Sequence, residues 1–215
     1  IAAVRKKARI PVIETGAGVC HIYVEKSARM DWAKRIVVNA KTRRPSVCNA
    51  LDTLVVDRAI AKPLLMAVAS DLATAGVKIF ADKTSYEILV NHYSAELLHH
   101  ATRQSYGREF LSLQMAIKVV SNWKTGVAHV MRYTSGHSEA IITGNKKIAQ
   151  EFTNTVDAAA VYVNAPTSFT DGFEFGLGAE IGISTQKLHA RGPMGLAALT
   201  TYKWIIEGAG QIRPA

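Results

Sequence analysis

A cysteine in a basic turn is the feature of this sequence that most directly suggests covalent chemistry. Cys48 follows two arginines, Arg43 and Arg44. Pro45, which favours a turn, and Ser46, a good cap residue, predict that a helix begins here. Cys48 would then lie in the first helical turn or in the tight turn that leads to it. Free backbone N–H groups, the helix dipole and the two arginines would lower the pKa of the thiol and make it a nucleophile. From local chemistry alone, a buried and inert cysteine remains the alternative.

Other residue types that could form a site give weaker signals. Cys20 falls in an alternating strand pattern, which predicts that it is packed in the core. His99 and His100 form a lone pair without further ligands at metal-binding spacing, so no metal site is predicted. The glycine-rich stretch 171–182 lacks the third glycine of a dinucleotide fingerprint and is more typical of a loop beside a binding cleft.

Composition limits the kind of protein and its partners. The 215 residues are 48% hydrophobic and 20% charged, which is typical of one or two globular domains. The net charge is +9, but the basic residues are scattered, which favours anionic small molecules over nucleic acid. No apolar run approaches the roughly 20 residues of a membrane span, so no membrane partner is predicted. With only two cysteines, a reducing, cytoplasmic location is expected. The chain begins with Ile1, and we expect it to be a piece of a longer protein.

The elements that must position these residues alternate along the chain. Strands separated by helices predict βαβ units, and therefore an α/β fold with a parallel sheet. Strands are expected at residues 9–13, 19–24, 77–80, 115–120, 140–143, 159–163 and 204–206. Helices are expected at residues 27–38, 59–75, 124–132 and 145–155. The run 54–56 fits a helix or a buried strand, and 86–106 gives no clear pattern. In such sheets we expect the site at the carboxyl ends of the strands.

Several separated stretches resemble one family. They are Val-Ile-Glu-Thr-Gly-Ala-Gly (12–18), Arg-Pro-Ser-Val-Cys-Asn-Ala-Leu (44–51), Ser-Gly-His-Ser-Glu-Ala-Ile (135–141), Tyr-Val-Asn-Ala (162–165), the glycine-rich region 169–185, and 187–195. In this order they resemble the γ-glutamyl phosphate reductases (glutamate-5-semialdehyde dehydrogenases) of the aldehyde dehydrogenase superfamily. The resemblance implies a parallel-sheet catalytic domain of the aldehyde dehydrogenase type, with only the end of the cofactor-binding domain present.

The resemblance assigns chemical roles to three residues. Cys48 matches the nucleophile. Glu14 lies 34 positions before it, as a glutamate does in the superfamily, and is a candidate proton acceptor for the thiol. Glu109 falls where the superfamily has a glutamate that contacts the nicotinamide ribose, which implies NADPH or NADP as cofactor. A structural hydrogen bond for Glu14 and a solvated carboxylate for Glu109 remain the alternatives.

The resemblance also implies a substrate and partners. The expected reaction is NADPH-dependent reduction of L-glutamyl 5-phosphate to L-glutamate 5-semialdehyde, with release of phosphate through a cysteine thioacyl intermediate, a step of proline biosynthesis. Contacts to the anionic ends of the substrate are expected from Arg44, Ser138, Asn164 and Thr170, for which ordinary loop hydrogen bonding is the alternative. A homo-oligomer is expected for the complete protein, and glutamate 5-kinase is a candidate partner. The alternatives are an aldehyde dehydrogenase that oxidises an aldehyde to an acid, and an incomplete fragment that acts only as a structural module.

The same resemblance divides the chain. Residues 1–14 would end the dinucleotide-binding domain, 15–190 would form the catalytic domain, and 191–215 would be a return segment that pairs with other subunits. The amino-terminal half of the family, with most of the cofactor site and an asparagine of the oxyanion hole, has no counterpart here. His137 and His189 are interpreted as structural.

Overall fold

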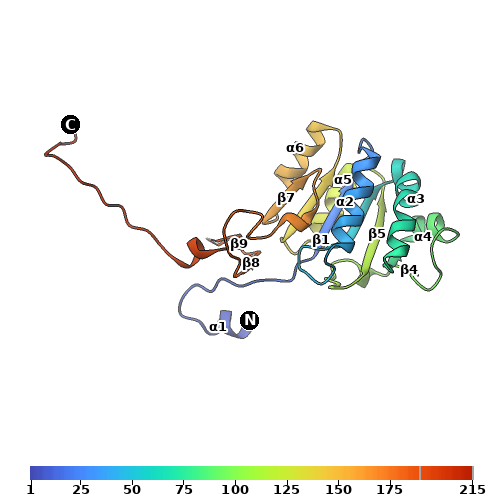
Figure 1. Ribbon diagram of the computed structural model, residues 1–215, viewed down its shortest axis with the longest axis horizontal. Coiled ribbons are helices and arrows are strands. Elements are labelled where there is room, and N and C mark those ends of the chain that lie inside the picture. The colour runs from blue at the N-terminus through green and yellow to red at the C-terminus, as the bar shows by residue number, and fades with distance from the viewer. Residues whose placement is uncertain (189, 215) are drawn as a thin grey trace.

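The computed structural model describes residues 1–188 and 190–214, and in this part of the chain seven parallel strands form one sheet (Figure 1). The strands run in the order β4-β3-β5-β2-β1-β6-β7. Their bounds are β1 (Cys20–Val24), β2 (Leu51–Asp57), β3 (Lys78–Ala81), β4 (Leu98–His100), β5 (Gln114–Val120), β6 (Ser138–Ile142) and β7 (Ala160–Val163). The predicted α/β class with a parallel sheet is confirmed.

Helices cover both faces of this sheet. They are α2 (Met30–Thr42), α3 (Arg58–Thr74), α4 (Lys83–Leu89), α5 (Trp123–Tyr133) and α6 (Lys146–Thr155). Helix α1 (Ala2–Lys7) lies away from the sheet (Figure 1), and the chain also forms short 3₁₀ turns, η1 (Arg103–Ser105), η2 (Thr167–Phe169) and η3 (Leu196–Leu199). Side chains of α2, α3 and α4 share one apolar cluster with the sheet, and those of α5 and α6 share the other. Such coverage buries both faces of a parallel sheet.

The central strand β1 shows why the elements pack in this way. Ile22 and Val24 point into the cluster with α2 and α3, whereas Tyr23 points into the cluster with α5 and α6. All five residues of β1 are buried, including Cys20, as predicted. Successive strand residues point to opposite faces, so a strand that is covered on both sides needs apolar residues at nearly every position.

The prediction that a helix begins near Cys48 is wrong. Residues 45–50 form turns, and β2 begins directly afterwards at Leu51. Every residue of β2 is buried, so its apolar run reflects a strand covered on both faces. The strand alternative at 54–56 is therefore confirmed, and no helix N-terminus lies beside Cys48.

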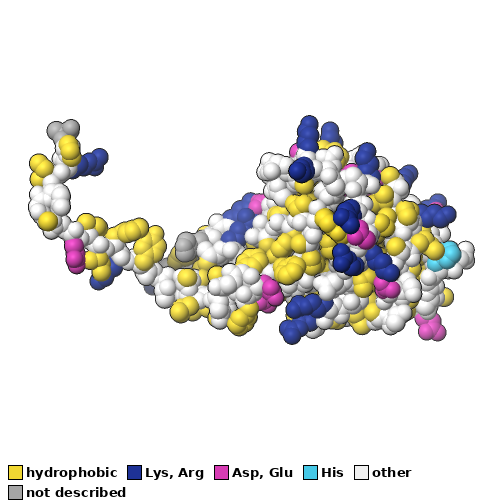
Figure 2. Space-filling model, turned by 45° about the horizontal axis from the view of Figure 1, so that its top comes forward, with side chains coloured by type: hydrophobic (Ala, Val, Ile, Leu, Met, Phe, Trp, Pro, Cys, Tyr) yellow, Lys and Arg dark blue, Asp and Glu magenta, His cyan; other side chains and the backbone are white. Residues whose placement is uncertain are grey.

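The predictions of two strands near the ends of the chain are also wrong. Residues 9–13 are irregular, and only Thr15 forms an isolated antiparallel bridge, to Ser184 of β8 (Gly182–Ser184). Residues 204–206 belong to an extended, exposed segment (Figure 1), whose apolar side chains stand out in Figure 2. A β-strand exists only by pairing with another, and 204–206 meets no partner strand among the described residues.

A small hairpin stands apart from the sheet. Strand β8 pairs antiparallel with β9 (Gly192–Met194), and the bridge to Thr15 attaches the segment that leads into β1. His189, interpreted as structural, lies outside the described residues. None of the described helices combines the length and apolar character needed to cross a membrane.

Candidate active site

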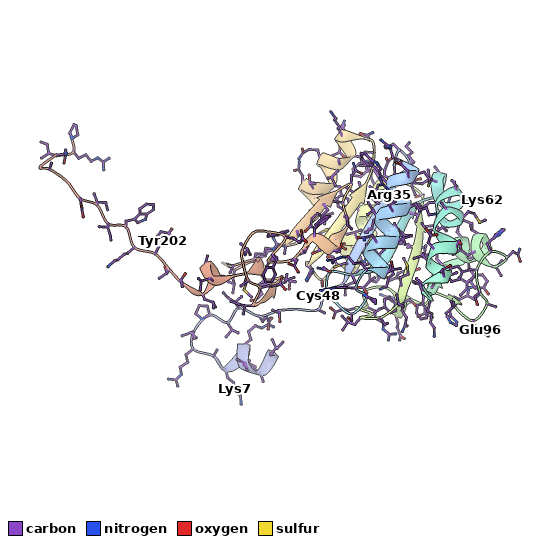
Figure 3. All side chains as sticks on the ribbon, viewed as in Figure 1. Lys7, Arg35, Cys48, Lys62, Glu96 and Tyr202 are labelled. Carbon is purple, nitrogen blue, oxygen red and sulfur yellow. The ribbon has the colours of Figure 1, made fainter. Side chains whose placement is uncertain are left out.

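Several of the candidate site residues lie at the edge of the sheet where the strands begin, which we call the amino edge. Cys48 lies in the turn before β2, Gly18 lies two residues before β1 begins, and Glu109 lies in the loop before β5. Because the strands are parallel, the turns that precede them meet at one edge. Figure 3 labels Cys48 at this edge, on the side toward β8 and β9. The expectation of a site at the carboxyl ends of the strands is therefore wrong for these residues.

Cys48 is half-buried, and its surroundings act on the thiol in two directions. Burial raises the pKa of Cys48, and the nearby carboxylate of Glu180 raises it further, followed by that of Glu109. The backbone N–H groups of Cys48 and Asn49 lower it, but the net pKa lies above the ordinary value. The prediction of a lowered pKa is wrong because no helix begins at Cys48, burial disfavours the thiolate, and the charges that act on the thiol are those of carboxylates.

Gly18 allows two loops to meet at Cys48. A Cβ atom on Gly18 would lie 2.1 Å from the carbonyl oxygen of Cys48, so no larger residue fits without moving the backbone. The same carbonyl accepts a hydrogen bond from the thiol of Cys20 at 3.2 Å. The turn around Cys48 is therefore held closely against the strand β1 and the loop before it.

Glu109 belongs to this group of residues. Its Oε1 accepts the backbone N–H of Gly18 at 2.8 Å, and in the described part of the chain no hydrogen bond engages Oε2. A carboxylate with one fixed and one free oxygen can accept a hydrogen bond from a ligand hydroxyl. Glu109 therefore fits the chemistry expected of a residue that binds the ribose of a nicotinamide cofactor.

Glu14 is engaged elsewhere. Its Oε1 accepts a hydrogen bond from Arg5 at 2.7 Å, and its backbone N–H donates to Gln186 at 2.9 Å. The carboxylates that act on Cys48 are those of Glu180 and Glu109. The observed contacts of Glu14 are structural hydrogen bonds, and its role as proton acceptor for Cys48 stays a prediction.

Ser138 and Thr170 lie behind the Cys48 turn. Their hydroxyls are 2.6 Å apart, and the Thr170 hydroxyl also lies 2.8 Å from that of Tyr162. Both side chains are fully buried. The side chain of Asn49 donates to the carbonyl of Thr170 at 3.0 Å, which links these residues to the turn that contains Cys48. The hydrogen bonds of Ser138 and Thr170 therefore stabilise the loops that pack against the Cys48 turn. Direct contact of either side chain with a substrate stays a prediction.

The structure separates Asn164 from Cys48. Asn164 follows β7, at the carboxyl edge, where its side chain bonds the backbone N–H of Thr143 at 2.9 Å and its carbonyl at 3.0 Å. The length of one five-residue strand, roughly 16 Å, lies between the two edges. Asn164 is therefore not part of the group around Cys48. Arg44, by contrast, is exposed near Cys48 in the chain.

The residue that the sequence reasoning missed is Glu180. It lies in the glycine-rich loop, its Oε2 accepts the backbone N–H of Gly172 at 2.8 Å, and its carboxylate is the strongest charge acting on Cys48. The stretch 171–182 was recognised as a loop beside a cleft, but nothing in its local pattern selects this glutamate.

The carboxyl edge, where a site was expected, carries a pocket of about 550 Å³. Three helices begin there, but each is capped by its own chain. Asp57, Asn122 and Asn145 accept first-turn N–H groups of α3, α5 and α6. The buried Glu25 in the same pocket accepts from Thr143 at 2.8 Å. These caps pair several of the first-turn N–H groups, and the cationic side chains of Lys26 and Arg58 also line the pocket. The described residues also contain no group of three His, Cys, Asp or Glu placed to hold a metal ion.

Comparison with known proteins relates the chain to one enzyme. No protein-family model matches it. The γ-glutamyl phosphate reductase of Chlorobium luteolum is 58% identical over 213 residues, which cover 98% of this chain and 50% of that protein. The crystal structure of γ-glutamyl phosphate reductase from Thermotoga maritima has 46% identity and a TM-score of 0.89, and the match covers 99% of this chain and 50% of that one.

A more distant solved structure shares only the fold. The acetylating aldehyde dehydrogenase of Geobacillus thermoglucosidasius has 17% identity and a TM-score of 0.59 over 92% of this chain and 49% of that chain. The fold is therefore of the aldehyde dehydrogenase type, as expected. The chain spans about half the length of the curated relatives it matches.

Proposed function

We propose that this chain, which matches one half of the γ-glutamyl phosphate reductases over nearly its whole length, carries the nucleophile of that reaction. The reaction is the NADPH-dependent reduction of L-glutamyl 5-phosphate to L-glutamate 5-semialdehyde. The observation that carries the proposal is the position of Cys48, half-buried at the amino edge of the sheet and next to Glu109.

The chemistry begins with the thiolate of Cys48. It attacks the acyl carbon of the substrate and expels phosphate, which leaves a thioacyl group on the sulfur. The backbone N–H groups of Cys48 and Asn49 already interact with the thiol, so they are placed to stabilise negative charge on the sulfur or on the acyl oxygen beside it. When bound, NADPH would supply the hydride to the acyl carbon, and the free oxygen of Glu109 is placed to accept a hydrogen bond from its ribose. The thiohemiacetal on Cys48 would then collapse: its carbon–sulfur bond breaks, the semialdehyde is released and the thiolate of Cys48 is restored.

Cys48 needs a proton acceptor because its pKa lies above the ordinary value. Glu180 is the carboxylate with the strongest influence on the thiol, and Glu14 is the one that the family resemblance selects. The exposed guanidinium of Arg44 is proposed to attract the phosphate of the substrate. Ser138 and Thr170 support the floor of the site rather than bind the substrate through free hydroxyls.

The proposal is tested by the reverse reaction in the full-length protein. Wild-type protein should reduce NADP⁺ with glutamate 5-semialdehyde only when inorganic phosphate is present. Cys48→Ala should abolish this activity. Cys20→Ala removes only the hydrogen bond from a buried thiol to the carbonyl of Cys48, so it should lower the activity without abolishing it. Substantial activity of the Cys48→Ala protein would exclude Cys48 as the nucleophile.

An oxidising aldehyde dehydrogenase is the second candidate, because an aldehyde dehydrogenase shares the fold. It would release an acid through attack by water and would not need phosphate. Phosphate-independent NADP⁺ reduction would therefore favour this candidate. A structural module without activity is the third, since the chain spans half of its relatives. It predicts no turnover even in the full-length protein.

A further inference from the structure

A buried carboxylate joins the three loops of the candidate site. Asp52 lies in β2, four residues after Cys48, and is 2% exposed. Its Oδ1 accepts the backbone N–H of Phe110 at 2.9 Å, and its Oδ2 accepts that of Cys20 at 3.3 Å. One side chain therefore links the beginnings of β1 and β2 to the loop before β5.

The ladder between β1 and β2 explains why Asp52 is free to do this. Cys20 lies opposite Leu51, but His21 lies opposite Thr53, so Asp52 is an extra residue between two regular pairs. Such a bulge re-aims a side chain and leaves a backbone group without its ladder partner. The N–H of Cys20 is satisfied by the carboxylate of Asp52 instead.

The hydrogen bonds form a closed ring. Asp52 holds Phe110, whose neighbour Glu109 accepts the N–H of Gly18, and Gly18 leads back to Cys20, which Asp52 also holds. The ring contains Glu109, and Gly18 lies against the carbonyl of Cys48. Any movement of Asp52 is therefore passed on to the nucleophile and to the proposed cofactor ligand together.

The charge of Asp52 faces buried basic groups, of which Lys41 has the larger effect and His21 the smaller. Burial raises the pKa of Asp52 to about 6, while the N–H of Phe110 and the ammonium of Lys41 oppose this rise. Lys41 is fully buried at the end of α2 and donates to the carbonyl of Leu51 at 2.8 Å. At neutral pH Asp52 is ionised, and both of its oxygens can accept hydrogen bonds.

We propose that Asp52 is a positioning residue that fixes Glu109 relative to the turn of Cys48 and so sets the rate of the chemical step. The proposal rests on the proposed function for its effect on turnover. Its effect on the geometry around Cys48 stands independently of that function.

The test compares Asp52→Asn and Asp52→Ala with Asp57→Asn in the full-length protein. Asp57 lies at the other end of the same strand, is 4% exposed and caps α3, so it matches Asp52 in residue type, strand and burial. Asn at position 52 has the same volume but only one side-chain oxygen, so one of the two hydrogen bonds is lost. If Asp52→Ala does not fold, Asp52→Asn decides the outcome.

Two readouts separate positioning from stability. Iodoacetamide alkylation of Cys48, followed by mass spectrometry, should be about fivefold faster in Asp52→Asn than in Asp57→Asn, because the turn is less tightly held. In the phosphate-dependent assay, kcat should fall about 10- to 100-fold, with KM for the semialdehyde changed less than about threefold.

Alkylation of Cys48 at the same rate in Asp52→Asn and Asp57→Asn would overturn the proposal. If the wild-type protein shows no turnover but the alkylation difference is present, the proposed function fails and the positioning role stands. If turnover depends on Cys48 but the alkylation rates are equal, the function stands and the positioning role fails.

Discussion

The thiol of Cys48 lies between opposing influences. Backbone N–H groups favour its ionised form, whereas burial and two carboxylates disfavour it, and the second set wins. In the proposed enzyme this thiol is therefore held protonated until a carboxylate takes the proton. Cys48 is therefore unreactive as a thiol and becomes a nucleophile once a carboxylate accepts its proton.

The first prediction concerns the charge of Glu180. The carboxylate raises the pKa of Cys48, so Glu180→Gln should lower that pKa and increase the thiolate fraction at pH 8. Iodoacetamide alkylation of Cys48 in the full-length protein, measured across pH, should show its rise shifted to lower pH. Glu174→Gln, an exposed glutamate of the same loop, serves as the control. A curve for Glu180→Gln that coincides with wild type would contradict the assignment.

The second prediction concerns the close approach at Gly18. A methyl group there overlaps the carbonyl of Cys48, so Gly18→Ala should lower the free energy of unfolding by about 1–3 kcal/mol and displace the nucleophile turn. Urea unfolding measures the first effect, and Cys48 alkylation the second. Gly208→Ala, at an exposed position of the carboxyl-terminal segment, should change neither. Wild-type stability in Gly18→Ala would show that this contact is looser than described.

At the residue scale, spacing and resemblance selected Cys48 and Glu109, which the structure brings to one edge. The same reasoning missed Glu180 and included Asn164, which lies at the opposite edge. The difference has a physical reason. A residue close in sequence to a strand end can lie at either edge, and the contact between a loop residue and a distant thiol depends on a fold that no local pattern encodes.

At the scale of single elements, helix α4 depends on one side chain. Asp82 caps it, accepting the N–H of Ser85 at 2.9 Å, and its second oxygen accepts the N–H of Val119 at 3.1 Å. The cap also carries an ion pair with Lys118 at 3.1 Å. One carboxylate thus begins the helix and anchors it to β5.

The third prediction follows from this cap. Asp82→Ala should lower the free energy of unfolding by about 1–2 kcal/mol, because both the helix N-terminus and a buried strand N–H lose an acceptor. Glu87→Ala, exposed on the same helix, should change stability by less than about 0.5 kcal/mol. Chemical denaturation compares the two. Equal stability of the two variants would mean that the cap contributes nothing.

Most elements of the sheet domain could be predicted, because their apolar runs and helix caps are local signals. Helix α3 and strands β5 and β7 agree with the expected ranges within one residue. The stretch 86–106, which gave no clear pattern, contains the end of α4 and the short strand β4, only three residues long. A helix of seven residues and a strand of three carry too little periodicity to be recognised.

At the scale of the whole molecule, the apolar side chains of the carboxyl-terminal segment are exposed, whereas those of the sheet are buried. Tyr202, Trp204 and Ile206 are 80%, 80% and 86% exposed, and Figure 2 shows apolar side chains along this segment. Exposed apolar residues of this size are typical of surfaces that take part in protein–protein contacts. The strand predicted at 204–206 would need such a partner to form.

The fourth prediction tests whether the carboxyl-terminal segment packs against another subunit. A homo-oligomer is proposed for the full-length protein, and Trp204→Ser combined with Ile206→Ser should reduce it to smaller species in sedimentation velocity, because the segment would lose apolar area available for association. Lys203→Ser, between the two positions, should leave the oligomer intact. An unchanged oligomer in the double variant would exclude this segment from the subunit interface.

The strand order also governs the sequence in which this chain can fold as it leaves the ribosome. Strand β5 lies between β3 and β2, so β3 and β4 connect to the rest of the sheet only through residues 114–120. Nascent chains that end before this point present two unjoined sheet fragments with open edges, which are prone to aggregation. We expect ribosome-bound chains to gain protease resistance abruptly once β5 has emerged, and synonymous codon changes that slow translation just before it to reduce the soluble yield.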